Sequence, residues 1–188
     1  GSGKVETAMA IAKVVNCQET EDGFCDACPS CLKIEGGNHP DILAVDQGED
    51  KSIKIHKVRE LIKRIQLRPY EANMKVAIIK DIDLMTTEGA NALLKTLEEP
   101  AGSSLLLLTT ANPERILETV KSRCHTVHFF GLSRKDLSQR LKDKTSLNSS
   151  DAAVISGFSE GCFGKALRLN DTEFIERKNN LIDQFLFK

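Results

Sequence analysis

The sequence predicts an α/β domain with a parallel sheet covered by helices on both faces, followed by a small helical domain. Four short apolar runs, at 41–46, 75–79, 104–110 and 126–130, have the length and composition of buried strands. They alternate with segments whose apolar residues recur at helical spacing. After Gly131 the pattern changes to a succession of short helical segments, which indicates a second domain.

Composition is that of a globular protein and excludes several classes. The 188 residues are 40% apolar and 28% charged, enough for one α/β domain and a small appendage. No apolar run approaches the roughly 18–20 residues that span a bilayer, and no signal peptide is recognisable, so we expect a cytoplasmic protein without membrane contact. A net charge of −1 lacks the basic footprint of a dedicated DNA binder.

The first half of the chain supplies two helices and two strands. "GSGK" precedes a helical stretch in which Ala8, Ile11, Ala12 and Val15 form one apolar face. A cysteine-rich insert and the strand at 41–46 follow. A second amphipathic helix begins near Ser52 and stops near Pro69, before the strand at 75–79.

The second half continues the alternation and then becomes helical. "GANALLKTLEEP" (89–100) has helical spacing and ends before its proline. A short helix at 114–124 separates the strands at 104–110 and 126–130. Short helices are expected at 133–142, 150–158 and 163–170, the first with Ser133 and Asp136 as a capping pair.

We therefore divide the chain into an α/β domain at 1–131, a helical domain at 132–170, and the start of a further helical region at 171–188. The last region is amphipathic and stops within its pattern. We expect the chain to be a fragment of a longer protein.

A cluster of cysteines is the strongest chemical feature. The four residues have the spacing C-x7-C-x2-C-x2-C, and they are Cys17, Cys25, Cys28 and Cys31. Four thiolates on tight turns suit a tetrahedral structural zinc with no room for a catalytic water, in a module at about 17–31. Free thiols on a loop are the alternative. His39 could replace one ligand, although "HPD" is more simply a turn, and Cys124 and Cys162 stand apart.

The opening of the chain resembles a damaged nucleotide-binding loop. Gly3 and Lys4 match the second half of G-x-x-x-x-G-K-[ST], in which the lysine contacts phosphate and the hydroxyl residue binds magnesium. Val5 stands at the hydroxyl position and offers no oxygen. The alternative is that "GSG" is an extension left by cloning.

The magnesium-binding acid is also replaced. In a nucleotide-hydrolysing α/β protein, the strand at 75–79 would be followed by an aspartate that holds magnesium and a glutamate that orients water. This chain has Lys80 and Asp81 instead. A cation at the metal position opposes magnesium binding. Val5 and Lys80 together indicate a fold built for ATP hydrolysis that no longer performs it.

Several motifs resemble the bacterial DNA polymerase III clamp-loader subunits over roughly residues 1–170. They are "HPDI" (39–42), "NALLKTLEEP" (91–100), "SRC" (122–124) and the four-cysteine insert. The resemblance implies an AAA+ domain with a zinc module after the P-loop helix, and a lid domain at 132–170. Compared with that family, the chain lacks the first strand, the front of the P-loop and most of the collar. Val5 and Lys80 match the delta-prime type, because the tau/gamma type keeps both hydrolytic motifs.

Two further residues take roles from this resemblance. Thr110 matches the sensor-1 position, or serves only as a hydrogen-bonding residue at a strand end. Arg123 matches the arginine that reaches a neighbouring subunit's ATP, against the alternative of an ordinary surface arginine. The degenerate nucleotide site would then be Gly3, Lys4 and Thr110. We expect it not to hydrolyse ATP, and whether it binds ATP is left open.

The implied function is that of a nonhydrolytic subunit that helps to load the sliding clamp onto primer-template DNA. Its partners would be tau/gamma and delta subunits, and Arg123 would act in trans. One rival is an ATP-hydrolysing tau/gamma-type subunit. The other is a free-standing zinc-containing DNA-binding module, which the near-zero net charge disfavours.

Overall fold

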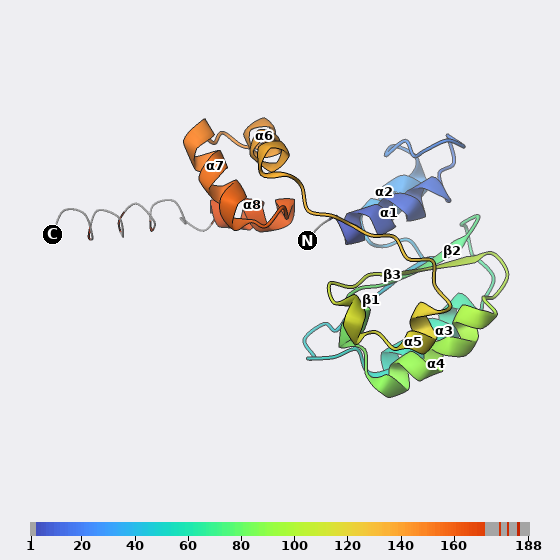
Figure 1. Cartoon of the computed structure of the whole chain (residues 1–188). Coiled ribbons are helices and arrows are strands. Elements are labelled where there is room, and N and C mark those ends of the chain that lie inside the picture. The colour runs from blue at the N-terminus through green and yellow to red at the C-terminus, as the bar shows by residue number, and fades with distance from the viewer. Residues whose placement is uncertain (1–2, 172–176, 178–179, 181–183, 185–188) are drawn as a thin grey trace. The chain divides into compact units, whose positions relative to one another are not determined.

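A computed structural model describes residues 3–171, 177, 180 and 184. The chain forms two compact units (Figure 1). One is Val5–Val127, and the other takes in the described residues from His128 onward together with Gly3 and Lys4.

The first unit is built on a parallel sheet of three strands. These are β1 (Ile42–Val45), β2 (Lys75–Ile79) and β3 (Ser104–Leu108), in the order β1-β2-β3. Ala44 lies opposite Ile78, which lies opposite Leu107. This confirms the predicted α/β fold with a parallel sheet.

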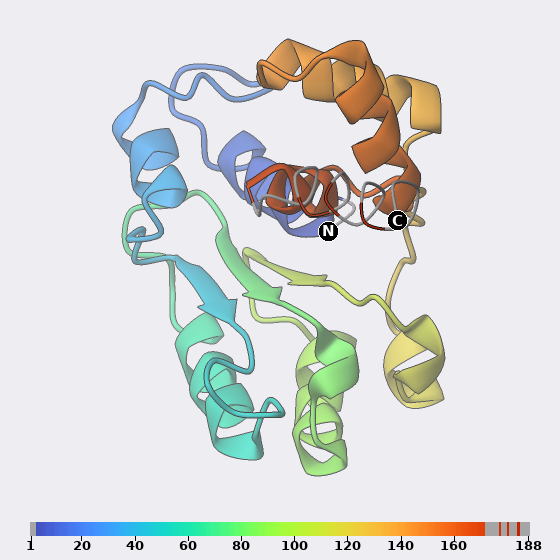
Figure 2. The ribbon, with the colours of Figure 1, turned by 90° about the vertical axis from the view of Figure 1, so that its left-hand side faces the viewer.

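Helices cover both faces of this sheet (Figure 2). On one face lie α1 (Lys4–Val14) and α2 (Pro29–Glu35), and on the other α3 (Ile55–Ile65), α4 (Thr87–Glu98) and α5 (Glu118–Lys121). Because side chains alternate along a strand, the two faces receive different residues of β2. Val76 and Ile78 pack with the α1–α2 side, and Ala77 and Ile79 with the α3–α4 side.

Short 3-10 turns and caps join these elements. The turns are η1 (Ile82–Leu84) and η2 (Pro113–Arg115). Thr86 begins α4, because its Oγ1 accepts a hydrogen bond from the Gly89 N–H at 3.2 Å. The cap places α4 directly after η1.

The "HPD" segment is the turn that the sequence suggests. Asp41 is buried, and its carboxylate accepts backbone hydrogen bonds from Tyr70, Glu71 and Ala72. Burial opposes its ionisation, but these bonds outweigh that effect and lower the pKa of Asp41. His39 accepts a hydrogen bond at Nδ1 from the Asp41 N–H, so its side chain is committed to this turn.

Two expectations about local structure were wrong, and one helix was missed. No strand forms at 126–130, where Val127 is 75% and Phe130 85% exposed, because no described strand pairs with this segment. Ile11 is exposed rather than part of the buried face of α1. The cysteine-rich insert contains α2, which was not anticipated although Pro29 stands at its start, where proline is favoured.

Within the described residues, the second unit contains three short helices, α6 (Arg134–Lys144), α7 (Ser149–Phe158) and α8 (Phe163–Asp171). Its core is Leu137, Leu141, Ala152, Ile155 and Ala166. The predicted cap is confirmed, since Ser133 Oγ accepts from the Asp136 N–H at 3.1 Å. The expected start of a further helical region at 171–188 lies almost entirely outside the described residues.

Two glycines allow a close backbone approach in this unit. A Cβ at Gly161 would lie 2.7 Å from the Cα of Gly131, and Gly161 has φ +76°. The Leu132 N–H donates to the Gly161 carbonyl at 2.9 Å across this approach. Throughout the described residues, we find no helix with the length and apolar character needed to cross a membrane.

Candidate metal centre and degenerate nucleotide site

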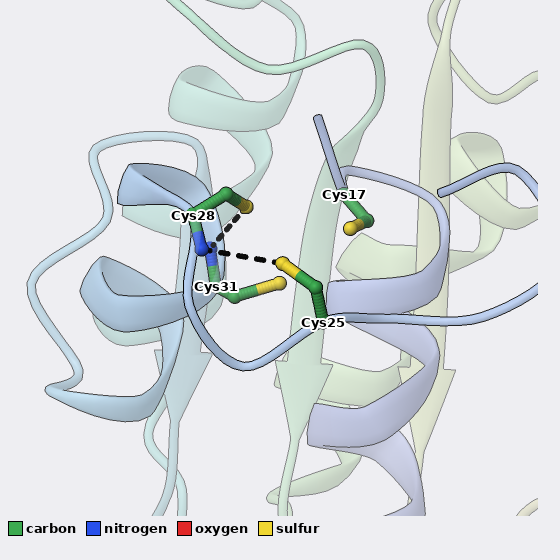
Figure 3. Close-up of side chains that lie close together, drawn as sticks. All are labelled: Cys17, Cys25, Cys28 and Cys31. Atoms are coloured by element: carbon green, nitrogen blue, oxygen red, sulfur yellow. Dashed lines mark hydrogen bonds between the residues drawn. The ribbon is translucent and has the colours of Figure 1, made fainter. Parts of the chain in front are cut away.

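The four clustered cysteines converge on one point (Figure 3). Their sulfur atoms all lie within 4.8 Å of one another. Cys17 follows α1, Cys25 lies in the loop, Cys28 caps α2, and Cys31 lies in the first turn of α2. The predicted cluster is thus formed by two helix ends and the loop between them.

Backbone N–H groups point at these sulfurs. The N–H of Cys28 donates to Cys25 Sγ at 3.2 Å, and that of Cys31 to Cys28 Sγ at 3.5 Å. The Glu19 N–H lowers the pKa of Cys17 to about 6, against the effect of burial. The Cys31 N–H likewise lowers the pKa of Cys28. Such donors stabilise the thiolate form, which is the form that binds metal.

Cys31 shows why the cluster fits a metal ion. Burial raises the pKa of its thiol to about 12, so without a cation it stays protonated at neutral pH. A bound divalent ion removes that proton and supplies the missing positive charge. Tetrahedral zinc with bonds of about 2.3 Å sets sulfurs about 3.8 Å apart, within the observed spread. The residues present therefore fit a four-thiolate zinc centre.

A buried lysine joins the metal loop to the helices beside it. Lys13 of α1 places Nζ 2.5 Å from Asp26 Oδ1 in the loop and 2.6 Å from Glu35 Oε2 at the end of α2. It also lies 5.2 Å from the ring centre of Phe24. Hydrogen bonds to Asp26 and Glu35 raise the pKa of Lys13. This contact could not be predicted from the sequence, because lysine in a helix normally faces solvent.

The other two cysteines lie elsewhere in the fold. Cys124 packs against the core cluster to which α3 and α4 contribute residues. Burial raises the pKa of its thiol. Cys162 immediately precedes α8. His39 is not among the grouped ligands.

The start of α1 carries the glycine and lysine of the degenerate loop. Gly3 has φ +82°, a backbone conformation that favours glycine, and Lys4 is the first residue of α1. Val5 follows in the first turn with an aliphatic side chain. A magnesium ligand from this position is therefore missing.

The residues after β2 occupy the place of the metal-binding acids. Lys80 places Nζ 3.6 Å from Asp46 Oδ2, beyond the end of β1. Asp81 has φ +49°, uncommon for a residue with a side chain, and its N–H donates to Thr109 Oγ1 at 3.2 Å. The ammonium of Lys80 is thus paired within the chain.

Thr110 makes a hydrogen bond at the end of β3. Its Oγ1 donates to Asp83 Oδ1 at 2.6 Å, and Asn112 Nδ2 donates to the other oxygen at 2.8 Å. Burial opposes ionisation of Asp83, but these two donors lower its pKa. Asp83 was missed because its partners lie almost thirty residues away in the sequence.

Arg123 follows α5 and is held by α4. Its Nε donates to Glu98 Oε1 at 2.7 Å, and Nη2 lies 2.5 Å from the same oxygen. Nη1 donates to the Thr119 carbonyl at 2.8 Å and to Ser122 Oγ at 3.2 Å. All three guanidinium nitrogens are engaged within the chain. Glu98 was not predicted as a partner.

The fold resembles that of a branch migration motor of known structure. A solved structure described as the RuvB Holliday junction branch migration motor of Thermotoga maritima matches with a TM-score of 0.55 and 16% identity, covering 94% of this chain and 61% of that one. At this identity the likeness concerns the fold. It defines the class as an α/β protein with a parallel sheet covered by helices on both faces.

The family is defined by sequence. The model of the family described as DNA polymerase III, delta subunit, matches residues 1–133, and the chain belongs to this family. This confirms the resemblance drawn from "NALLKTLEEP" and "SRC".

The curated relatives include both subunit types. DNA polymerase III subunit delta' of Bacillus subtilis is 39% identical over 141 residues, covering 75% of this chain and 43% of the relative. Subunit delta' of Pseudomonas aeruginosa is 36% identical, covering 66% and 38%. Subunit tau/gamma of Haemophilus influenzae is 34% identical, covering 75% and 20%. The chain thus spans less than half the length of these relatives.

Proposed function

We propose that the chain is the AAA+ part of a nonhydrolytic, delta-prime-type subunit of a DNA polymerase III clamp loader. The observation that carries this proposal is Lys80, a cation paired with Asp46 where a hydrolytic relative needs a magnesium-binding acid. A lysine there repels magnesium, and Val5 removes the second magnesium ligand. Family membership and the two delta' relatives support the assignment to a DNA polymerase III subunit of the delta-prime type.

In this proposal the subunit acts on its neighbours. The helical residues 132–170 serve as its lid, and the four cysteines hold structural zinc that fixes the loop between α1 and α2. Tau/gamma and delta subunits are its partners, and the sliding clamp and primer-template DNA are reached through the assembly. A cytoplasmic location agrees with a role in replication.

Arg123 is its contribution to catalysis. The planar, permanently charged guanidinium suits the spread charge of a transferring phosphoryl group. An arginine supplied in trans increases the rate of phosphoryl transfer about 10³–10⁵-fold in other systems. Arg123 is on an exposed segment after α5, from which it can meet the ATP of a neighbouring subunit.

The test is ATP hydrolysis by an assembly reconstituted with the full-length protein. Arg123→Ala should lower DNA-stimulated hydrolysis and clamp loading in part, because the remaining ATP sites receive arginines from other subunits. Arg123→Lys should rescue poorly, since it lacks the planar fork. Arg115→Ala, an exposed arginine on η2, is the matched control. Unchanged rates for Arg123→Ala in an intact assembly would refute the trans role.

A tau/gamma-type ATPase is the second candidate, since one tau/gamma relative is 34% identical over 142 residues. Magnesium-dependent ATP turnover by the isolated protein would favour it.

A further inference from the structure

The pair formed by Glu98 and Arg123 links two elements at the exposed end of α4. Glu98 is the last residue of α4, and Arg123 follows α5. The side chains are 49% and 33% exposed, so the pair is partly solvated. One carboxylate oxygen of Glu98 receives both Nε and Nη2 of the arginine.

This geometry uses the edge of the guanidinium that a phosphate needs. Bidentate recognition of a phosphate requires two N–H groups on one edge of the fork. Glu98 occupies the Nε–Nη2 edge, and Thr119 and Ser122 occupy Nη1. A phosphate from another subunit must therefore displace at least one of these partners.

We propose that Glu98 is a positioning residue that masks Arg123 until a neighbouring subunit presents a phosphate. This inference rests on the trans role of Arg123 proposed above, and it adds the regulation of that residue. Before docking, the carboxylate holds the guanidinium against α4. On docking, the phosphate takes the place of the carboxylate, and Glu98 turns to solvent.

The strength of the pair suits such an exchange. An exposed ion pair changes an equilibrium by about two- to fivefold, whereas an arginine in trans changes the rate of phosphoryl transfer by about 10³-fold or more. The ion pair between Glu98 and Arg123 is therefore weak enough for the phosphate of a bound nucleotide to displace the carboxylate. Removing the Glu98 charge should raise the rate of ATP hydrolysis modestly.

A matched pair of variants is available in the sequence. Glu98→Gln removes the charge that holds Arg123 and keeps the size of the side chain. Glu99→Gln removes the same charge one residue later, from an exposed side chain that makes no hydrogen bond or ion pair within the described part of the chain. A difference between the two variants reports the contact and not the net charge.

The experiment measures steady-state ATP hydrolysis by the reconstituted assembly as a function of ATP concentration. Glu98→Gln should raise kcat/KM about two- to fivefold, and Glu99→Gln should not change it. In an Arg123→Ala background, Glu98→Gln should have no effect, because the residue through which it acts is gone.

A second readout uses the isolated full-length protein. An arginine-selective dicarbonyl reagent, with modified sites mapped by mass spectrometry, should modify Arg123 faster in Glu98→Gln than in Glu99→Gln. An equal rate in the two variants would contradict the mask.

The outcomes separate the two proposals. If Arg123→Ala lowers hydrolysis but Glu98→Gln matches or falls below the unmodified protein, the mask is wrong and the trans role stands. A gain from Glu98→Gln that persists in the Arg123→Ala background also overturns the mask. If Arg123→Ala changes nothing, the trans role fails and the mask fails with it.

Discussion

The cysteine cluster and the strand ends differ in how their polar groups are satisfied. In the cluster, four sulfurs converge within 4.8 Å of one another, and the deeply buried Cys31 needs a cation to ionise. At the strand ends, Lys80 pairs with Asp46, and Thr110 and Asn112 donate to Asp83. The first region fits a bound ion. In the second region, the charged groups pair with other groups of the same chain.

This difference separates a site that fits a ligand from a site whose polar groups are satisfied within the chain. A partly buried polar group without a partner costs free energy, so such groups are usually paired. The strand ends keep polar residues, but these residues are now partners of one another.

The largest expected effect comes from removing the metal. Cys31→Ser, or a strong chelator, should release about one zinc per chain and destabilise the first unit. The loss is about 4 kcal/mol if free zinc stands about 1,000-fold above its Kd. Elemental analysis and thermal denaturation measure the two effects. Cys162→Ser is the control and should keep its zinc, while a protein prepared without chelator that contains no zinc would refute the site.

Lys13 tests whether the cluster depends on its surroundings. Lys13→Met removes the ammonium that joins Asp26 and Glu35 to α1 and keeps the length of the side chain. Zinc affinity should fall about tenfold, the lower end of the effect of residues that orient metal ligands. Competition with a coloured chelator measures it.

The control for Lys13 is Lys33→Met, which removes an exposed lysine paired with Glu71. Its zinc affinity should remain that of the unmodified protein. Equal affinities for both variants and the unmodified protein would show that the loop holds metal without α1.

A smaller effect is expected at the strand ends. Thr110→Val removes one donor to Asp83, and should cost about 1 kcal/mol of the free energy of unfolding at pH 7. Because the pKa of Asp83 is lowered in the folded chain, the unfolded chain binds more protons. The stabilisation is therefore present above the ordinary pKa of about 3.9 and is lost as pH falls through the lower folded value.

Urea unfolding at pH 7 and at acidic pH tests this account of Asp83. The difference between Thr110→Val and the unmodified protein should shrink as Asp83 becomes protonated. A difference that does not change with pH would contradict it.

The features predicted correctly from the sequence are those set by residues close together in the chain. The four cysteines lie within fifteen residues of one another in the sequence, so their cluster could be predicted. β2 was predicted at its observed bounds, because its apolar run is bounded by polar residues. The strand expected at 126–130 was wrong, because a strand needs a partner that composition cannot guarantee. Contacts such as Glu98 with Arg123 join residues 25 positions apart, and their pairing depends on how α4 and α5 pack.

The account depends most on the claim that this subunit does not hydrolyse ATP. The direct measurement is steady-state, magnesium-dependent ATP turnover by the isolated full-length protein, with an active tau/gamma subunit as the positive reference. We predict no turnover above background, and none in Lys80→Asp, because Val5 still offers no oxygen to magnesium. Turnover well above background that disappears in Lys4→Ala would contradict the account and assign the chain to the hydrolytic type.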